Sequence, residues 1–224
     1  MNWLSSALTS TVGRKWVMGL TGFFLIGFVL VHLAGNFLLY VGDGAYNHYA
    51  HSLHANPNLV LAAEVILLIL FGAHIFLGFQ LTIANRRARP NGYEMRRSKQ
   101  DQTKAAPSAT MFVTGALVLG FILLHLADFR FHLRNTGPEG EEPFVRALRI
   151  LQDPITASVY FFGSILLGWH LWHGFQSAFQ SLGLRHPKYT PIIGKIGVVL
   201  TLILALGFAS FPVWAYLKKF GVLP

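Results

Sequence analysis

Cysteine and charged residues are scarce in this chain. It contains no cysteine, which excludes disulfide bonds, iron–sulfur clusters held by cysteine thiolates and covalent attachment of haem. Only 12% of its 224 residues are charged, about half the share of an ordinary soluble domain. Acidic residues are the scarcer sign, with 9 Asp and Glu against 18 Lys and Arg. A chain so poor in charge and 53% hydrophobic is predicted to be an integral membrane protein.

Long apolar segments, each of about 20 or more residues, predict an all-α integral membrane fold with five transmembrane helices in one domain, residues 1–224. The predicted helices cover about residues 16–41, 58–85, 108–131, 157–180 and 193–217. The first segment is too long for a signal peptide and has no small-residue cleavage pattern, so it is predicted to stay in the mature protein. The segment PFVRALRIL in the third connection is predicted to form a short interfacial helix.

The basic residues predict the orientation in the membrane. The N-terminus (Arg14, Lys15), the second connection (residues 86–104) and the fourth (residues 185–195) hold 12 of the 18 Lys and Arg, and the first connection holds none. By the positive-inside rule the N-terminus is cytoplasmic and the C-terminus lies outside, in a multi-pass protein of the inner (cytoplasmic) membrane. Because the net charge of +9 follows the membrane segments instead of one soluble face, it indicates contact with membrane lipid and no nucleic-acid partner.

An internal repeat places one histidine in each of four apolar segments. GFVLVHLAGNF around His32 reappears as GFILLHLADFR around His125, and GAHIFLGFQ around His74 reappears as GWHLWHGFQ around His170. The separations within the two halves are 42 and 45 residues, so each half is predicted to be a copy of one helical hairpin. Counted along the helices, His32 and His125 lie roughly 24 Å from the inner surface, and His74 and His170 roughly 17 Å.

Histidines matched in depth on different helices predict haem binding. Imidazole is costly in a bilayer, so four of them at equivalent positions indicate a function. A haem iron with two axial imidazoles takes its ligands from opposite sides of the ring, which two facing helices supply. Four of the helices are therefore predicted to form a haem-binding bundle with two haem b, one between His32 and His125 and one between His74 and His170.

Other residues are candidates for contacts with the haems. Gly35, Gly78 and Gly174 follow a ligand by three or four positions and are predicted to leave room for a flat ring, whereas the equivalent position after His125 is Asp128. The repeat aligns His170, not His173, with His74, so His173 is either a propionate or quinone contact or a polar residue near the inner boundary. Arg14 and Lys15 either neutralise haem propionates or are ordinary positive-inside anchors.

Two further groups of polar residues admit a functional and a plain interpretation. Glu64 is taken as the only acid in a helix interior, where it either exchanges protons with a quinone or faces water at the outer end of the second helix. His48, His51 and His54 recur every three residues like a metal-binding run, but no carboxylate or cysteine completes a site, so a short surface helix is predicted.

The runs SSALTSTVGRKWVMGLTGFFLIGFVLVHLAGNFLLY and WHLWHGFQSAFQSLG, with the four-histidine spacing, resemble the dihaem cytochrome b subunit of succinate dehydrogenases and fumarate reductases, the single-subunit type with five helices. The resemblance implies a membrane anchor for a flavoprotein subunit and an iron–sulfur subunit at the cytoplasmic face, which exchanges electrons with a quinone pool, commonly menaquinone. It implies that His74 and His170 bind the haem proximal to the iron–sulfur subunit, and His32 and His125 the distal haem.

The resemblance also sets limits. Some members carry a carboxylate two residues before the ligand in the fourth helix, and here that position is Gly168. The chain has no flavin or nicotinamide fingerprint, so partners must oxidise succinate. The basic connection, residues 86–104, is either a solvated loop or a docking site for the iron–sulfur subunit.

Two other functions remain open at this point. One is the dihaem, quinone-reactive cytochrome b of another respiratory complex, such as a hydrogenase. A quinol–cytochrome c reductase is disfavoured because its cytochrome b typically places two ligands on each of two helices. The other is a haem-free anchor or transporter in which histidines relay protons, although the apolar neighbours of His32, Val31 and Leu33, offer no polar chain.

Overall fold

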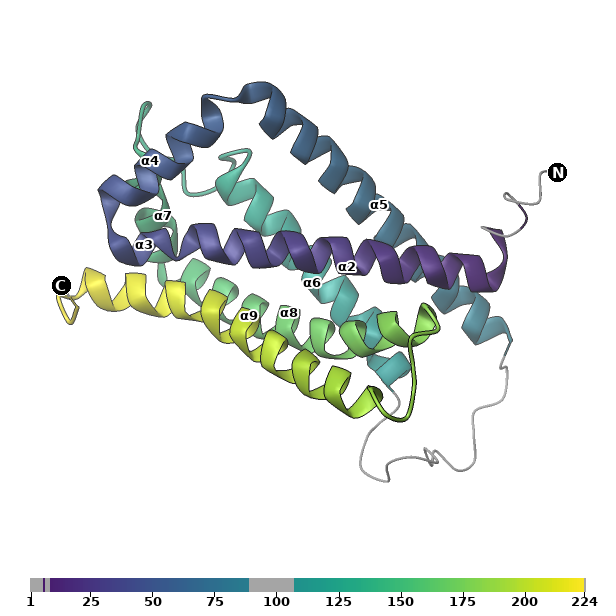
Figure 1. Cartoon of the computed structure of the whole chain (residues 1–224). Helices are drawn as coiled ribbons and strands as arrows, with labels where there is room; N and C mark the ends of the chain where they lie inside the picture. Colours follow the sequence, from purple (N-terminus) through teal and green to yellow (C-terminus); the bar gives the residue numbers. More distant parts are fainter. Residues whose placement is uncertain (1–5, 7–8, 89–106, 224) are drawn as a thin grey trace.

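A computed structural model describes residues 6, 9–88 and 107–223, and all regular secondary structure within these residues is helical (Figure 1). The helices are α2 (Thr11–Asn36), α3 (Leu38–Val41), α4 (Asp43–His54), α5 (Pro57–Arg87), α6 (Pro107–Phe129), α7 (Pro143–Leu151), α8 (Pro154–Ser181) and α9 (Thr190–Lys219). Five spans in these residues are long and apolar enough to cross a membrane: Thr11–Val41, Pro57–Arg87, Thr110–Phe129, Pro154–Ser181 and Thr190–Lys219. The prediction of a helical, multi-pass chain is confirmed at this level.

Caps and turns decide where the long helices begin and end. The Ser10 side chain accepts a hydrogen bond from the Gly13 amide at 3.0 Å, so α2 begins five residues before the predicted start. Asp153 caps α8 in the same way at the Thr156 amide, at 2.8 Å. α6 ends at Phe129 because the chain then turns through His132, whose φ is 52°. The predicted helix ends were taken from the apolar segments, which do not include these polar caps and turns. The predicted ends therefore differ from the observed ones by a few residues.

α8 and α9 pack together more extensively than any other pair of helices in the described residues. Glycine permits this approach, because a Cβ added to Gly168 would lie 2.5 Å from the Cβ of Ala205. α5 is the opposite case. It lies beside α2, touches α6 only slightly, and none of its residues is buried. The bundle is therefore dense on the α8–α9 side and loose around α5.

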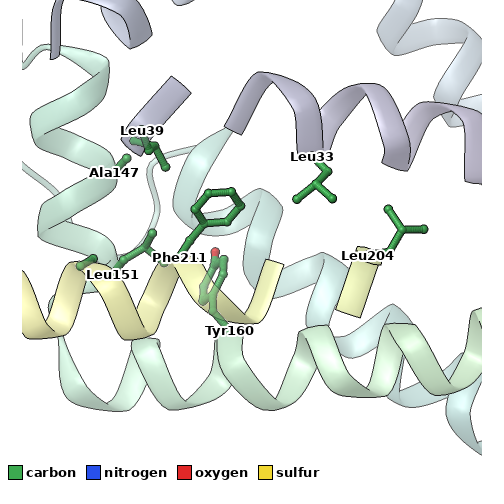
Figure 2. Close-up of a cluster of buried hydrophobic side chains, with 8 residues drawn as sticks. Leu33, Leu39, Ala147, Leu151, Tyr160, Leu204 and Phe211 are labelled. Atoms are coloured by element: carbon green, nitrogen blue, oxygen red, sulfur yellow. The ribbon is translucent and has the colours of Figure 1, made fainter. Parts of the chain in front are cut away.

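A buried apolar cluster closes the end of the bundle where α4 and α7 lie, opposite the start of α2 (Figure 1). Figure 2 shows it as side chains from α2, α3, α7, α8 and α9. Its members are Leu33, Leu39, Ala147, Leu151, Tyr160, Leu204, Phe211 and Ala215. The predicted short helix is confirmed as α7, but its apolar residues pack on the protein: Ala147, Ile150 and Leu151 are buried.

Candidate functional site

Two pairs of histidines face each other inside the bundle. The rings of His32 on α2 and His125 on α6 have centres 5.8 Å apart, with planes at 81°. The rings of His74 on α5 and His170 on α8 have centres 6.4 Å apart, with planes at 78°. All four side chains are half-buried. The structure thus brings together the residues that the repeat and the depth count had matched.

The two pairs lie farther apart than residue counting predicts. His74 contacts α2 at Thr21, which lies 11 residues before His32, so about 16 Å along the helix axis separates the pairs. The count along each segment gave a difference of only about 7 Å. It measured every helix from its own end, whereas α5 and α6 are inclined to α2 (Figure 1).

All four histidines line one open cavity of about 3390 Å³ between α2, α5, α6 and α8. Two imidazoles that bind one metal ion from opposite sides, with metal–nitrogen bonds of about 2 Å, have ring centres about 6 Å apart. Both pairs have this spacing, and the loose packing of α5 leaves volume between the helices. The residues present therefore suit two haems with paired axial histidines, of the b type because the chain has no cysteine.

The pair formed by His74 and His170 contacts two threonines that were not among the predicted site residues. The hydroxyl oxygens of Thr21 and Thr114 each lie 3.2 Å from Nδ1 of a histidine, His74 and His170 respectively. The Thr21 hydroxyl donates its proton to the Met18 carbonyl at 3.0 Å, and the Thr114 hydroxyl donates to a carbonyl one turn earlier. Each oxygen can then only accept from Nδ1–H, which leaves Nε2 unprotonated and able to bind a metal.

Glycines complete the same arrangement. A Cβ at Gly22 would lie 3.4 Å from Cε1 of His74, and a Cβ at Gly115 would lie 3.2 Å from Cε1 of His170. Each imidazole therefore rests against the backbone of a Thr-Gly pair. A signal for this was present: the pattern Met-x2-Thr-Gly precedes both His32 and His125 by the same number of residues. The sequence does not show the role of this pattern, because each Thr-Gly pair contacts a histidine on another helix.

The three glycines that were expected to make room for haem also lie near protein side chains. A Cβ at Gly35 would lie 2.7 Å from the hydroxyl oxygen of Tyr49, so the missing side chain accommodates that tyrosine. Gly78 faces the end of Met18 at 3.4 Å, and Gly174 faces a methionine of α6 at 3.8 Å. Their role in haem packing stays a prediction, because the position of a glycine on its own helix does not reveal what the neighbouring helix presents. Gly35 and Gly78 still line the cavity, and Gly174 does not.

Two acidic residues of the membrane-spanning helices have basic or polar partners. Glu64 lines the cavity, and its carboxylate pairs with Arg130 through two hydrogen bonds of 2.7 and 3.1 Å, with 38% of the side chain exposed. A second acid, Asp128, lies at the end of α6 with no side-chain exposure. Tyr160 donates to one Asp128 oxygen at 3.0 Å, and Arg134 Nε lies 3.1 Å from the other, without hydrogen-bond geometry. The sequence pattern marked Asp128 only as the residue that replaces glycine after His125.

Some of the residues that were predicted to contact haem propionates or quinone line the cavity, and others do not. Lys15 and His173 line the cavity near the start of α2, and Arg14 does not. The ring of His173 stacks on that of Trp172, with centres 5.4 Å apart. Arg86 also lines the cavity, but residues 89–104 of the basic connection lie outside the described residues.

The histidine run in the first connection forms the predicted surface helix, α4, which has no buried residue. His51 Nε2 pairs with Glu142 at 2.9 Å, and His54 Nδ1 lies 2.7 Å from the Ala50 carbonyl. These side chains therefore have separate partners. Throughout the described ranges no three His, Cys, Asp or Glu side chains gather as a metal site.

Comparison of the chain with protein-family models, with curated proteins and with solved structures finds no match.

Proposed function

We propose that this protein is a membrane cytochrome b that holds two haems, each between two histidines from different helices. His74 and His170 hold the inner haem, and His32 and His125 the outer one. The observation that supports this most strongly is the spacing of the two ring pairs, 6.4 and 5.8 Å between centres, beside one shared cavity. Bound in this way, haem b supplies one-electron transfer.

The chain's own residues orient the inner ligands and surround the outer ones with aromatic rings. Thr21 and Thr114 fix the tautomer of the inner histidines, as described above. The outer histidines lie among aromatic rings, with Phe28 stacked on His32 at 5.4 Å between centres. The separation of about 16 Å between the pairs puts them at two depths of a bilayer core about 30 Å thick. The arrangement suits electron transfer through much of the membrane.

The larger assembly is proposed from the resemblance in the sequence. We assign the chain as the membrane anchor of a succinate:quinone oxidoreductase, with a flavoprotein subunit and an iron–sulfur subunit bound at the cytoplasmic face. Quinone, commonly menaquinone in the resembled family, is the second electron carrier. Lys15 and Arg86 line the cavity near the start of α2. The positive-inside rule assigns this end of the helix to the cytoplasm. Both basic side chains can pair with haem propionates there. Glu64, at the other end, is the candidate for proton exchange with quinone.

Haem content tests the central proposal. We expect two haem b per chain in the purified membrane complex, by pyridine haemochrome assay, and two components in a redox titration. His74→Ala and His170→Ala should each remove the same component, and His32→Ala and His125→Ala the other. His48→Ala, at a histidine of α4 that does not line the cavity, is the control and should retain both. A wild-type complex without haem would refute the proposal, and co-purification with hydrogenase subunits would refute the succinate assignment.

A further inference from the structure

We infer that Thr21 and Thr114 are positioning residues that set the electron-donating strength of the inner ligands, and that the outer ligands lack this control. The inference rests on the proposed function, because it concerns His74 and His170 as haem ligands. Its basis is a difference between the two pairs that the repeat does not predict.

The two threonines are well placed to hold a directed hydrogen bond. Both threonines are buried, because only 6% of the surface of Thr21 and 7% of that of Thr114 is exposed. Water therefore does not compete for their hydroxyl groups. Each hydroxyl is itself fixed by its bond to a carbonyl of its own helix. A hydrogen bond in such low-dielectric surroundings is stronger than in water. Each imidazole is thus held in one tautomer and one orientation.

The bond changes the chemistry of the ligand as well as its position. A histidine that donates Nδ1–H to an acceptor carries more electron density, and its Nε2 becomes more basic. A more basic ligand stabilises the ferric state, which carries the greater positive charge, over the ferrous state. Thr21 and Thr114 therefore lower the midpoint potential of the inner haem, compared with a site in which the acceptor is missing.

The outer pair is surrounded differently. His32 contacts the rings of Phe28 and Phe208, with centres 5.4 and 5.8 Å away. His125 contacts three further aromatic rings, among them Tyr160 at 6.0 Å. In the part of the chain that the structure describes, neither ring has a hydrogen-bond partner comparable to a threonine. Substitution of the threonines should therefore affect one haem and spare the other.

The test is a redox titration of both haems in the membrane complex, read from optical and EPR spectra. Thr21→Val keeps the shape of the side chain and removes the acceptor. At a fixed ambient potential we expect the ferrous-to-ferric ratio of the inner haem to rise about tenfold, equivalent to about 59 mV for a one-electron couple. The outer haem should be unchanged. Thr114→Val should act in the same direction, and the double variant should shift the inner haem further.

Two further variants keep the test decisive. Thr21→Ser retains the hydroxyl and should have the wild-type midpoint potential of the inner haem. This variant still tests the inference if Thr21→Val fails to bind the inner haem. Thr201→Val is the control, because Thr201 is buried on α9 and its hydroxyl has no hydrogen-bond partner among the described residues. Unchanged potentials in Thr21→Val with both haems bound, or an equal shift of both haems, would overturn the inference and leave the proposed function standing. A wild-type complex without haem would overturn both.

Discussion

The contact between α8 and α9 can be tested with one added methyl group. Gly168 lies against Ala205, and a Cβ at Gly168 would come within 2.5 Å of the Ala205 Cβ and 3.6 Å of its Cα. Ala205 cannot avoid this contact by rotating its side chain, because its Cβ is attached directly to the backbone. In Gly168→Ala the two helices must therefore move apart.

The expected effect follows from two opposing contributions. Alanine in a helix interior is favoured over glycine by about 0.5 to 1 kcal/mol, and overpacking a close contact costs about 1 to 3 kcal/mol. Gly174→Ala, six residues later in the same helix, is the matched control. A Cβ there meets nothing closer than a methionine end at 3.8 Å, so only the favourable contribution applies. The difference between the two variants isolates the clash, at about 1 to 3 kcal/mol.

The assay is equilibrium unfolding of the purified protein in mixed micelles with increasing SDS, followed by circular dichroism. Gly168→Ala should unfold at a lower SDS fraction than Gly174→Ala, and Gly174→Ala at the same fraction as wild type or higher. If Gly168→Ala proved as stable as Gly174→Ala, the close packing of α8 on α9 would be wrong. The same packing explains why Gly168 leaves no space for the carboxylate that some members of the resembled family carry there.

Three further substitutions have distinct expected outcomes. Hydrogen bonds from Arg149 hold the pKa of Glu141 below its ordinary value of 4.5, so its stabilising effect is complete above pH 4.5 and disappears as the pH falls through the lower folded value. SDS unfolding at several pH values should show that Glu141→Gln loses this dependence, and an unaltered pH profile would contradict it. Tyr160→Phe removes a buried donor to Asp128 and should cost about 1 to 3 kcal/mol by the same assay; no loss would exclude that bond. Glu64→Gln should lower quinone-linked turnover with both haem spectra intact and change stability by less than about 1 kcal/mol, because its ion pair is exposed. Unaltered turnover would remove the proposed role.

The parts of the fold that depend on local chemistry were predictable. Apolar runs of membrane-spanning length follow from composition alone, and all five appear as helices. The ends were less predictable because single side chains decide them, such as the Ser10 cap of α2 and the turn at His132. The four histidines were found because a repeated pattern in an apolar context is visible without knowledge of the fold.

Length, hydropathy and repetition are properties of the chain, and they predict a multi-pass helical protein with a repeated histidine position in each of four helices. What each helix presents to its neighbour depends on the tertiary structure. It paired Thr21 with His74, set Tyr49 against Gly35 and buried Asp128 beside Tyr160. Helices that are apolar on every side carry little periodic signal of which face turns inward. Their rotation and tilt are fixed by interhelical packing, so these contacts cannot be read from one segment at a time.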